Sequence, residues 1–433
     1  MRGSRLRKGL FLDAIGPELE GRTVEVTGWV EEQRDLGSLV FQVLRDSRGA
    51  AQVVYERSRM GEALERVRST TLQSYVYVRG EVARGRGRRF PFEIRASEYE
   101  VLGPARHPLP LDPSGSVPAG LDVRLDNRPL DLRNPRTAAI FSIRAKFLRA
   151  AREYLRSQGF IEVNTPKIIG SAAEGGADLF ELEYFGRKAY LAQSPQLYKE
   201  QLTMSLERVF EIAFYYRAEK FNTQRHLNEF TSVDVEAAMF YKEDAMKLLE
   251  GLVVEAGGAA VDESRREFEV LGREPPRAAG PFPVITYSQA LEVLRSKGLE
   301  LPFGEDLGGE ALRLLAEEHG GYYFIVDWPL DAKPFYIHPK GDGLSESFDL
   351  MFGQLELASG GQRIHERALL EERLRAKGLD PEGFRDHLKF YDWGMPPHSG
   401  WGFGADRYLM VLTGTGNIRE VVLYPRDPTR LTP

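Results

Sequence analysis

Three glycines and one arginine stand close together near the end of the chain, in GWGFGADRYLMVLTG. Gly400, Gly402 and Gly404 alternate, so in a strand they would leave one face without side chains, and a flat ring could lie against the backbone there. Arg407 lies in the next helical turn, where a guanidinium can stack on a ring or bind a phosphate. The pattern indicates a nucleotide site, although close packing of a strand against a helix would produce the same spacing.

A second cluster of charged and aromatic residues lies in FYYRAEKFNTQRHLNEFTSVDVE. One predicted strand ends at Arg217 and Glu219, and the next begins at Phe230. The loop between them holds Arg225 and His226. Guanidinium groups, an imidazole and an aromatic ring on one hairpin fit a bent triphosphate beside a stacked base. The chain has no Walker A loop and no G-x-G-x-x-G between a strand and a helix, so a nucleotide would be bound by a different geometry.

Oxygen-donating side chains gather in a third segment, FDLMFGQLELASGGQR. Glu356 and Ser359 are three residues apart and Asp349 lies upstream, which is a donor set suited to Mg²⁺ beside phosphates. Arg363 follows directly after the double glycine. An Asp–Glu pair that only keeps a strand edge soluble is the alternative.

These segments require a scaffold, and the hydrophobic pattern predicts one. An amphipathic helix is expected at TAAIFSIRAKFLRAAREYLRSQG, ending at Gly159, followed by the alternating strand FIEVNTPKI. Several further strands with interposed helices predict an antiparallel sheet flanked by helices, which places this part in the α+β class. Residues 241–330 are predicted to form a mainly helical insertion.

The N-terminal part has a different character. Five short strand patterns between residues 22 and 103 predict a small β-barrel of the OB-fold type. Residues 1–106 contain 19 Lys and Arg against 15 Asp and Glu, whereas the whole chain has a net charge of −6. A basic module favours a polyanionic partner, and a solvated charged loop is the alternative. Candidates for stacking and phosphate contacts are Trp29, Arg34, Phe41 and Tyr55.

The proline-rich stretch GPARHPLPLDPSGSVP separates the two parts. We therefore predict domains at 1–104 and 134–433, joined by a linker at 105–133. The chain has no cysteine, which excludes disulfides, thiolate catalysis and Cys-ligated zinc and suits a reducing interior. No apolar run reaches the length of a membrane span, so we expect a cytoplasmic protein with no membrane partner.

The three clusters together resemble the signature motifs of class II aminoacyl-tRNA synthetases, and in detail the aspartyl enzymes of subclass IIb in their compact archaeal or eukaryotic form. The likeness extends from GWVEEQRDLG to the terminal PRDPTRLTP. It implies an OB-fold anticodon-binding domain, a class II catalytic domain, and a homodimer with Pro166 at its interface. Two positions depart from the family pattern: Asp406 makes GADR of the usual GAER, and Lys220 stands where an acidic residue is common.

The resemblance implies roles for individual residues. Arg217 would hold the α-phosphate and the amino acid carboxylate, and with Arg407 it forms the expected catalytic pair. Phe230 and Arg407 would cover opposite faces of adenine, and Arg225 and His226 would face the β- and γ-phosphates. The implied Mg²⁺ ligands are Glu356, Ser359 and Asp349. The implied ATP-binding residues are Arg217, Glu219, Arg225, His226, Leu227, Phe230, Glu356, Gly404, Ala405, Asp406 and Arg407.

The near relatives charge aspartate, asparagine or lysine, so the pocket must select the amino acid. Burying the anionic aspartate side chain requires paired cations, which Lys199 in QSPQLYK and Arg363 in GGQR supply. A lysine pocket would need acids at both positions, which excludes lysine. Glu174 in the AAEGGADLF loop would meet the substrate ammonium. The complete set expected to bind the amino acid is Glu174, Gln193, Gln196, Lys199, Arg217, Ser359 and Arg363.

Aspartate–tRNA ligase is therefore the expected function. The alternatives are an asparagine–tRNA ligase and a non-charging relative that binds tRNA. The same resemblance implies that the barrel binds the anticodon, and that tRNA(Asp) is the partner. The anticodons of tRNA(Asp) and tRNA(Asn) differ only at the third base, so charging of tRNA(Asn), followed by a partner amidotransferase, stays open. The residues expected at the anticodon are Arg34, Phe41, Gln52 and Arg86.

Overall fold

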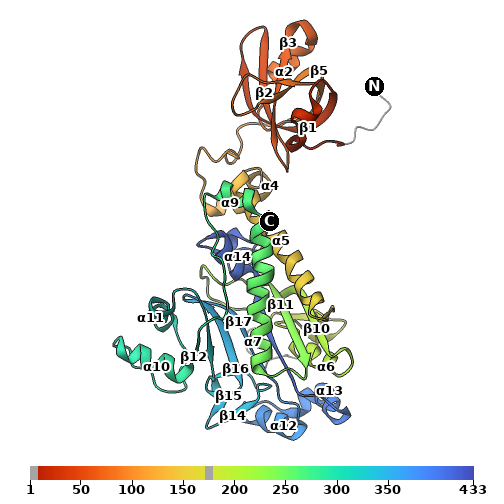
Figure 1. Cartoon of the computed structure of the whole chain (residues 1–433). Coiled ribbons are helices and arrows are strands. Elements are labelled where there is room, and N and C mark those ends of the chain that lie inside the picture. The colour runs from red at the N-terminus through yellow and green to blue at the C-terminus, as the bar shows by residue number, and fades with distance from the viewer. Residues whose placement is uncertain (1–7, 171–178) are drawn as a thin grey trace. The chain divides into compact units, whose positions relative to one another are not determined.

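A computed structural model of the chain describes residues 8–170 and 179–433. Within it the chain divides into two compact units, residues 1–138 and 139–433 (Figure 1). The predicted linker falls inside the first unit, so the exact domain limits at residues 104 and 134 stay predictions.

Five strands of the first unit close into a barrel with the order β1-β2-β3-β5-β4, which confirms the predicted small barrel. Neighbouring strands are antiparallel except β3 and β5, which are parallel. The elements are β1 (Thr23–Asp35), β2 (Leu39–Arg45), β3 (Ala50–Glu56), α1 (Arg57–Met60), α2 (Ala63–Ser69), β4 (Tyr75–Arg84) and β5 (Phe92–Gly103).

Alternation along β2 and β3 separates the inner and outer faces of the barrel. Val40 and Leu44 of β2 and Val53 of β3 are fully buried in the barrel core. Tyr55 lies on the same inner face, is also fully buried, and donates its hydroxyl hydrogen to Gln42 Oε1 at 2.8 Å. The expectation that Tyr55 contacts a nucleic acid is wrong, because its ring is part of the barrel core.

Two short helices follow the barrel. Residues 104–120 form no helix or strand, and α3 (Leu121–Asp126) and α4 (Arg128–Asp131) come next. The Arg128 side chain is fully buried, and its Nη1 donates to Asp131 Oδ2 at 2.9 Å. Arg124 Nε donates to the other oxygen of Asp131 at 3.0 Å, so one carboxylate joins the two helices.

The second unit is built on an eight-stranded sheet with the order β12-β13-β16-β17-β18-β11-β10-β6. The two outermost pairs are parallel and all pairs between them are antiparallel, which confirms the predicted α+β class. The segment 241–330 is mainly helical, but it is more than a connection, because it adds β12 and β13 to the sheet. Two smaller sheets, β7-β9-β8 and β14-β15, complete this unit. Its strands are β6 (Ile161–Glu162), β7 (Ile168–Ile169), β8 (Glu181–Tyr184), β9 (Arg187–Leu191), β10 (Arg208–Tyr216), β11 (Glu229–Ala238), β12 (Val284–Thr286), β13 (Tyr322–Val326), β14 (Pro339–Gly341), β15 (Leu344–Ser345), β16 (Ser347–Phe352), β17 (Leu355–Gln362) and β18 (His398–Gly404).

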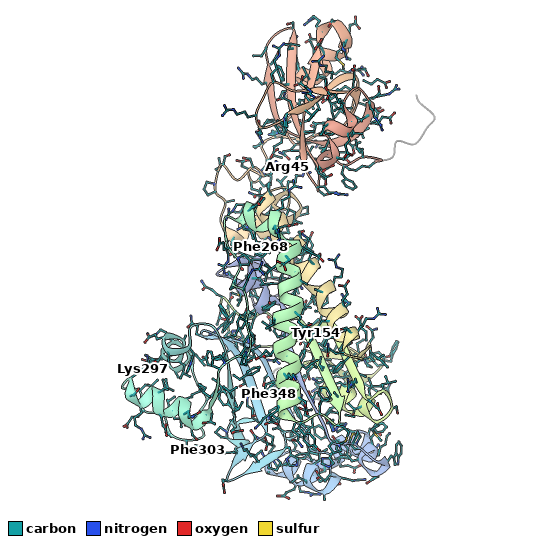
Figure 2. The ribbon with its side chains drawn as sticks, viewed as in Figure 1. Arg45, Tyr154, Phe268, Lys297, Phe303 and Phe348 are labelled. Atoms are coloured by element: carbon teal, nitrogen blue, oxygen red, sulfur yellow. The ribbon has the colours of Figure 1, made fainter. Side chains whose placement is uncertain are left out.

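Long helices cover one face of this sheet and form the main hydrophobic core with it. α5 and α7 run along the strands in Figure 1. Phe147 and Tyr154 of α5 join Val233, Phe348 and Phe403 of the strands in one buried cluster. Tyr154 and Phe348 are labelled in Figure 2. Among the described helices, none has the length and apolar character that crossing a bilayer requires. The helices are α5 (Pro135–Ser157), α6 (Gln196–Leu206), α7 (Lys242–Gly251), α8 (Gly257–Glu263), α9 (Arg265–Leu271), α10 (Tyr287–Ser296), α11 (Gly309–His319), α12 (Arg367–Ala376), α13 (Arg385–Leu388) and α14 (Ala405–Thr413).

Candidate active site

A cavity of about 360 Å³ opens on the other face of the central strands. Along β11, Val233 and Val235 enter the hydrophobic core while Ser232 and Asp234 line the cavity, because successive strand residues point to opposite faces. The structure thus brings into one cavity most of the side chains that the sequence singled out. Those lining it are Gln193, Gln196, Arg217, Glu219, Arg225, His226, Leu227, Phe230, Glu356, Ser359, Arg363, Gly404, Asp406 and Arg407.

Every second residue in the middle of β18 is a glycine, and the residues between the glycines are buried. A Cβ atom on Gly400 would collide with the Val235 carbonyl oxygen and would lie 2.5 Å from Glu236 Oε2. At this position protein atoms, and not a ligand, fill the space beside the glycine. Gly402 and Gly404 line the cavity. The bare surface that a ligand could contact is therefore the end of the strand that leads into α14.

The side chain of Arg407, in the first turn of α14, reaches Glu356 of β17. Its Nη1 donates to the Glu356 carbonyl oxygen at 2.9 Å and lies 3.5 Å from Glu356 Oε1. Burial lowers the pKa of Arg407; the Glu356 carboxylate opposes this shift, while Arg217 and Arg225 add to it. Guanidinium groups that depress one another's proton affinity in one cavity mark a place where a polyanion would be stabilised.

The hairpin between β10 and β11 carries the second cluster. The Arg217 guanidinium lies 5.3 Å from the ring centre of Phe230 and 3.9 Å from Glu219 Oε1. Asn228, which sequence reasoning missed, donates from its side-chain amide to the carbonyl oxygens of Arg217 at 2.6 Å and of Glu219 at 2.9 Å. Its amide therefore fixes the backbone that presents both charged side chains.

His226 lies in the same hairpin, among cations. Its pKa is lowered to about 4, first by burial and then by the positive charges of Arg407 and Arg225. Thr223 Oγ1 lies 2.6 Å from His226 Nδ1, which orients the ring. The imidazole is neutral at neutral pH, so it can offer a phosphate a hydrogen bond but no charge.

Glu356 and Ser359 both line the cavity although they are three residues apart on β17. In a regular strand that spacing would place them on opposite faces. The pairing of β17 with β16 changes register here: Leu350 pairs with Ala358 and Met351 pairs with Glu356, so Leu357 between them is the extra residue of β17. This bulge turns the carboxylate and the hydroxyl to the same side.

Asp349 pairs with Ser359 across the two strands, but its side chain is buried beside a lysine. Lys333 Nζ donates to both Asp349 oxygens, at 2.9 and 2.7 Å. Burial raises the pKa of Asp349, and the positive charge of Lys333 opposes that shift. Lys333 lines the cavity, whereas Asp349 lies behind it. Sequence reasoning missed this lysine, because only the folded chain brings Lys333 into contact with Asp349.

The donors that remain open suit an ion shared with a substrate. The Glu356 side chain is about half exposed (48%), and the Ser359 hydroxyl faces the same cavity. Within residues 8–170 and 179–433, no three acidic or histidine side chains come close enough to hold a metal by themselves. Mg²⁺ keeps several waters and is commonly bound by one or two carboxylates plus phosphate oxygens, so Glu356 and Ser359 fit it, and Asp349 could join only if Lys333 moved.

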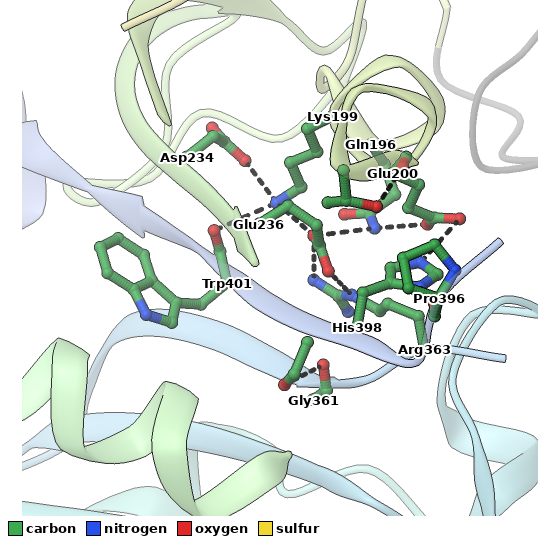
Figure 3. A network of polar contacts seen from close by, with 12 residues as sticks. Gln196, Lys199, Glu200, Asp234, Glu236, Gly361, Arg363, Pro396, His398 and Trp401 are labelled. Atoms are coloured by element: carbon green, nitrogen blue, oxygen red, sulfur yellow. Dashed lines mark hydrogen bonds and ion pairs between the residues drawn. The ribbon is translucent and has the colours of Figure 1, made fainter. Parts of the chain in front are cut away.

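Buried ion pairs surround the end of the cavity that is lined by Gln196, Asp234 and Arg363 (Figure 3). Lys199 Nζ lies 3.2 Å from Asp234 Oδ1 and donates to the Trp401 carbonyl oxygen at 3.1 Å. Arg363 donates through Nε and Nη2 to both oxygens of Glu236, at 3.0 and 3.3 Å. Lys199 itself lies behind the lining residue Asp234. Sequence reasoning missed both acids, although alternating acids in VDVE on a strand with an apolar opposite face could have indicated them.

Two matches to families of known sequences cover nearly the whole chain. Residues 120–428 match the model of "tRNA synthetases class II (D, K and N)", and residues 24–102 match that of the "OB-fold nucleic acid binding domain". The chain belongs to the class II aminoacyl-tRNA synthetases. The predicted OB-fold and the predicted class II catalytic domain are confirmed.

Two full-length relatives of this synthetase carry the same name. The "Aspartate--tRNA(Asp/Asn) ligase" of Methanocaldococcus jannaschii is 47% identical, and the alignment covers 97% of each chain. The protein of the same name from Archaeoglobus fulgidus is 46% identical over 97% of this chain and 98% of its own.

Solved structures with the same architecture include enzymes for two amino acids. Asparaginyl-tRNA synthetase from Pyrococcus horikoshii, in complex with asparaginyl-adenylate, has a TM-score of 0.92 and 32% identity, with 99% of this chain and 100% of that chain covered. Aspartyl-tRNA synthetase from Entamoeba histolytica has a TM-score of 0.86 and 29% identity, with 98% and 93% covered. The fold of a class II synthetase is therefore compatible with either amino acid.

Asp406, Ala405 and Glu174 differ from the other predicted residues of the synthetase site. Asp406 lines the cavity, but one of its oxygens binds Arg144 and the other accepts the backbone N–H of Thr231 at 2.8 Å, so it ties α14 to α5 and β11. Ala405 is fully buried at the start of α14 and is not part of the lining. Glu174 lies outside the described residues.

The predicted anticodon residues of the synthetase lie on the outside of the barrel. Arg34 pairs with Phe41 across β1 and β2, and Gln52 pairs with Val43 across β2 and β3, so Arg34, Phe41 and Gln52 share the outer face. Gln52 Nε2 donates to Glu93 Oε2 at 2.9 Å. Arg86 lies in the exposed loop between β4 and β5.

Proposed function

We propose that this synthetase is an aspartate–tRNA ligase. It activates L-aspartate with ATP to aspartyl-adenylate and then transfers the aspartyl group to the 3′ end of tRNA(Asp). The observation that carries the proposal is a pair of buried cations at one end of the cavity, Arg363 in its lining and Lys199 behind the lining residue Asp234, while Arg217, Phe230 and Arg407 also line the cavity. The name shared by the full-length relatives supports the same conclusion.

In the first step the aspartate α-carboxylate attacks the α-phosphorus of ATP and pyrophosphate leaves. Arg217 stabilises the negative charge that develops on the α-phosphate, with Arg225 and Arg407 beside the phosphates and the base. Glu356 and Ser359 would hold Mg²⁺, which would supply charge neutralisation at the phosphate oxygens. Since the attacking carboxylate is already ionised, the chain needs only to align the two substrates and exclude water.

In the second step a hydroxyl of the terminal adenosine of tRNA attacks the aspartyl carbonyl carbon and AMP leaves. The OB-fold positions the tRNA by its anticodon, with Arg34, Phe41, Gln52 and Arg86 as contacts. Arg34, Phe41 and Gln52 are placed on adjacent strands where bases can stack and phosphates can pair with guanidinium groups. We propose that tRNA(Asn) is a second substrate, because the relatives bear the name Asp/Asn; its product would then need an amidotransferase.

An asparagine–tRNA ligase is the second candidate, because an asparaginyl enzyme matches the structure over nearly the whole chain. A neutral amide side chain does not require two buried cations, whereas a carboxylate does. A non-charging relative is disfavoured, because Arg217, Glu356, Ser359 and Arg407 all line one cavity.

We also propose that the synthetase is a cytoplasmic homodimer. The sheet ends at β6, which has only two residues, and exposed apolar side chains lie on β6, on the neighbouring strand β10 and on β7, which follows β6 in the chain. Ile161 of β6 is 47% exposed, and Ile168 of β7 and Phe214 of β10 are each 49% exposed. Unpaired sheet edges with exposed apolar residues favour association. A monomer in analytical ultracentrifugation at micromolar concentration would contradict this part of the proposal.

Aspartate-dependent exchange of pyrophosphate into ATP tests the activation step, with asparagine as the comparison substrate. We expect exchange with aspartate and none above background with asparagine; the reverse would establish the second candidate. Charging of transcripts of tRNA(Asp) and tRNA(Asn) with labelled aspartate then tests the partners. Charging of tRNA(Asp) alone would remove tRNA(Asn) and the amidotransferase from the proposal.

A further inference from the structure

A layer of buried ionic groups lies behind the amino acid end of the cavity (Figure 3). Lys199 and Arg363 pair with Asp234 and Glu236, as described above. Glu200 of α6 and His398 of β18 lie next to them, and both side chains are fully buried. Neither lines the cavity, and no role follows for either residue from the proposed reaction.

The hydrogen bonds of His398 determine where its protons are. Nδ1 lies 2.8 Å from the Pro396 carbonyl oxygen, which can only accept, so Nδ1 carries a hydrogen. Nε2 is buried, has no hydrogen-bond partner within the described part of the chain, and faces Glu200 Oε2 at 3.8 Å. A neutral ring would therefore direct a lone pair at a buried carboxylate, which is unfavourable. The Glu200–His398 pair must hold one further proton.

The surroundings of Glu200 favour its ionised form. Tyr391 donates to Oε2 at 2.8 Å and Gln196 donates to Oε1 at 2.5 Å. Burial alone would raise the pKa of Glu200, but His387 and His398 bring it well below its ordinary value. Burial alone would lower the pKa of His398, but Glu200 and Glu236 raise it. The proton therefore resides on His398, and the pair is an ion pair.

This pair is connected to Arg363 in two ways. Gln196 Nε2 lies between the two acids, 2.5 Å from Glu200 Oε1 and 3.5 Å from Glu236 Oε2, and Glu236 holds the Arg363 guanidinium. The Arg363 backbone N–H donates to the His398 carbonyl oxygen at 2.9 Å. The side chain and the main chain of the same arginine are thus both positioned by the pair.

We propose that Glu200 and His398 are a positioning pair whose single shared proton sets the affinity of the site for aspartate. The proposal rests on aspartate being the substrate. With the proton present, the positive charges of Lys199, Arg363 and His398 balance the three buried acids. Without it, one excess negative charge remains close to the place where an anionic side chain must bind. The other titratable or charged groups that face the pair are Tyr391, His387, His365, Glu236 and Arg363.

The direction of the pH dependence follows from the raised pKa of His398. The proton is held at and below the ordinary histidine value of about 6.5 and is lost only as the pH rises through the raised pKa. We therefore expect the KM for aspartate to rise about tenfold on the alkaline side of about pH 6.5, as one buried charge lost at moderate distance would cause. The KM for ATP should stay within about threefold over the same range.

Four proteins separate this charge effect from a structural one, with pyrophosphate exchange as the assay. Glu200→Gln should abolish the rise of the aspartate KM at alkaline pH. Without the Glu200 charge, His398 is neutral throughout, and Lys199 and Arg363 still balance the two remaining buried acids. His398→Gln should raise the KM for aspartate about tenfold already at neutral pH, because Glu200 is left unpaired. The double variant should return to within about threefold of the unmodified protein. Tyr391→Phe, which removes a hydrogen bond from Glu200 but no charge, should keep the pH profile.

A flat aspartate KM in the unmodified protein would overturn the proposal, and so would a Glu200→Gln variant that keeps the rise. A double variant that is worse than either single one would also overturn it, since that is the pattern of a packing role. If His398→Gln does not fold, the comparison of the unmodified protein with Glu200→Gln still decides. A protein that exchanges pyrophosphate with asparagine and not with aspartate would instead contradict the proposed function.

Discussion

Replacing Lys199 by methionine tests whether the site binds an anionic side chain. The lysine is only 3% exposed, and its ammonium lies 3.2 Å from Asp234 and 3.5 Å from Glu236. Methionine keeps most of the side-chain volume and removes the charge. An asparagine site should barely respond to this change, whereas an aspartate site should lose one of its two cations.

The expected magnitude can be estimated from Coulomb's law. A carboxylate at about 4 Å from the ammonium, in a medium of effective dielectric constant about 20, is stabilised by about 4 kcal/mol. Part of this is recovered, because burial already raises the pKa of Asp234 and the freed acid can take up a proton. We therefore expect the KM for aspartate to rise about 100-fold, which corresponds to about 2.7 kcal/mol, while the KM for ATP changes less than about threefold.

The chain offers a matched control in Lys242. This lysine is 5% exposed and lies 2.7 Å from both Asp327 and Glu346, but it is not part of the cavity lining. Both Lys→Met variants should lose stability in urea unfolding. Lys199→Met should lose about 3 to 5 kcal/mol, because buried Asp234 loses its ion pair. Lys242→Met should lose less, because Asp327 keeps Lys340 at 2.7 Å and Glu346 is partly exposed. Only Lys199→Met should change the KM for aspartate in pyrophosphate exchange. A Lys199→Met protein with an aspartate KM within about threefold of the original would refute the reasoning.

Three further predictions concern the nucleotide end and the strand beneath it. Phe230→Ala should raise the KM for ATP about 5- to 30-fold, the loss of one stacking contact of about 1–2 kcal/mol, and leave the KM for aspartate unchanged; an unaltered ATP KM would remove Phe230 from the adenine site. Gly400→Ala should lower the free energy of unfolding in a urea titration by about 1–3 kcal/mol, because the new Cβ collides with the Val235 carbonyl oxygen. Gly416→Ala, where the added Cβ meets open space, should change the free energy of unfolding by less than about 0.5 kcal/mol. The pKa of His226 is lowered to about 4, so the stability that its neutral form contributes is complete above the unfolded value of about 6.5 and is lost as the pH falls toward 4. Since the imidazole stays neutral from about pH 6.5 to 8, the KM for ATP should be constant in that range. A change in the ATP KM in that range that His226→Gln removes would contradict the neutral state.

Much of the fold could be predicted from local patterns. Strand alternation and turn residues indicated a barrel, and helical periodicity with interposed strands indicated an antiparallel sheet flanked by helices. The assignment failed at Tyr55, because AAQVVYE alternates in either register and only closure of the barrel decides which face is inside. It was also incomplete at β12 and β13, where short apolar strands are embedded among helices.

The candidate site was predicted less evenly. The residues predicted for the ATP, Mg²⁺ and amino acid sites came from type and spacing and from the family resemblance, and within the described residues all of them but Lys199, Asp349 and Ala405 line the cavity. Their protein partners did not stand out. Lys333, Asn228 and Glu236 look like ordinary polar residues in the sequence, and each acquires its function from a contact made by a neighbouring strand, loop or hairpin.

The sequence by itself determined which chemical groups this protein can bring to a reaction: a strand with little side-chain bulk, several guanidinium groups, an aromatic ring and two cations for an anionic substrate. It determined this because side-chain identity and short-range spacing are local properties. Only the tertiary structure decided which charges neutralise each other. One buried layer joins Glu200 of α6, Glu236 of β11, His398 of β18 and Arg363, which directly follows β17. These residues meet because the segments that carry them are adjacent in space. The net charge of a buried layer depends on those contacts, and no local pattern contains them.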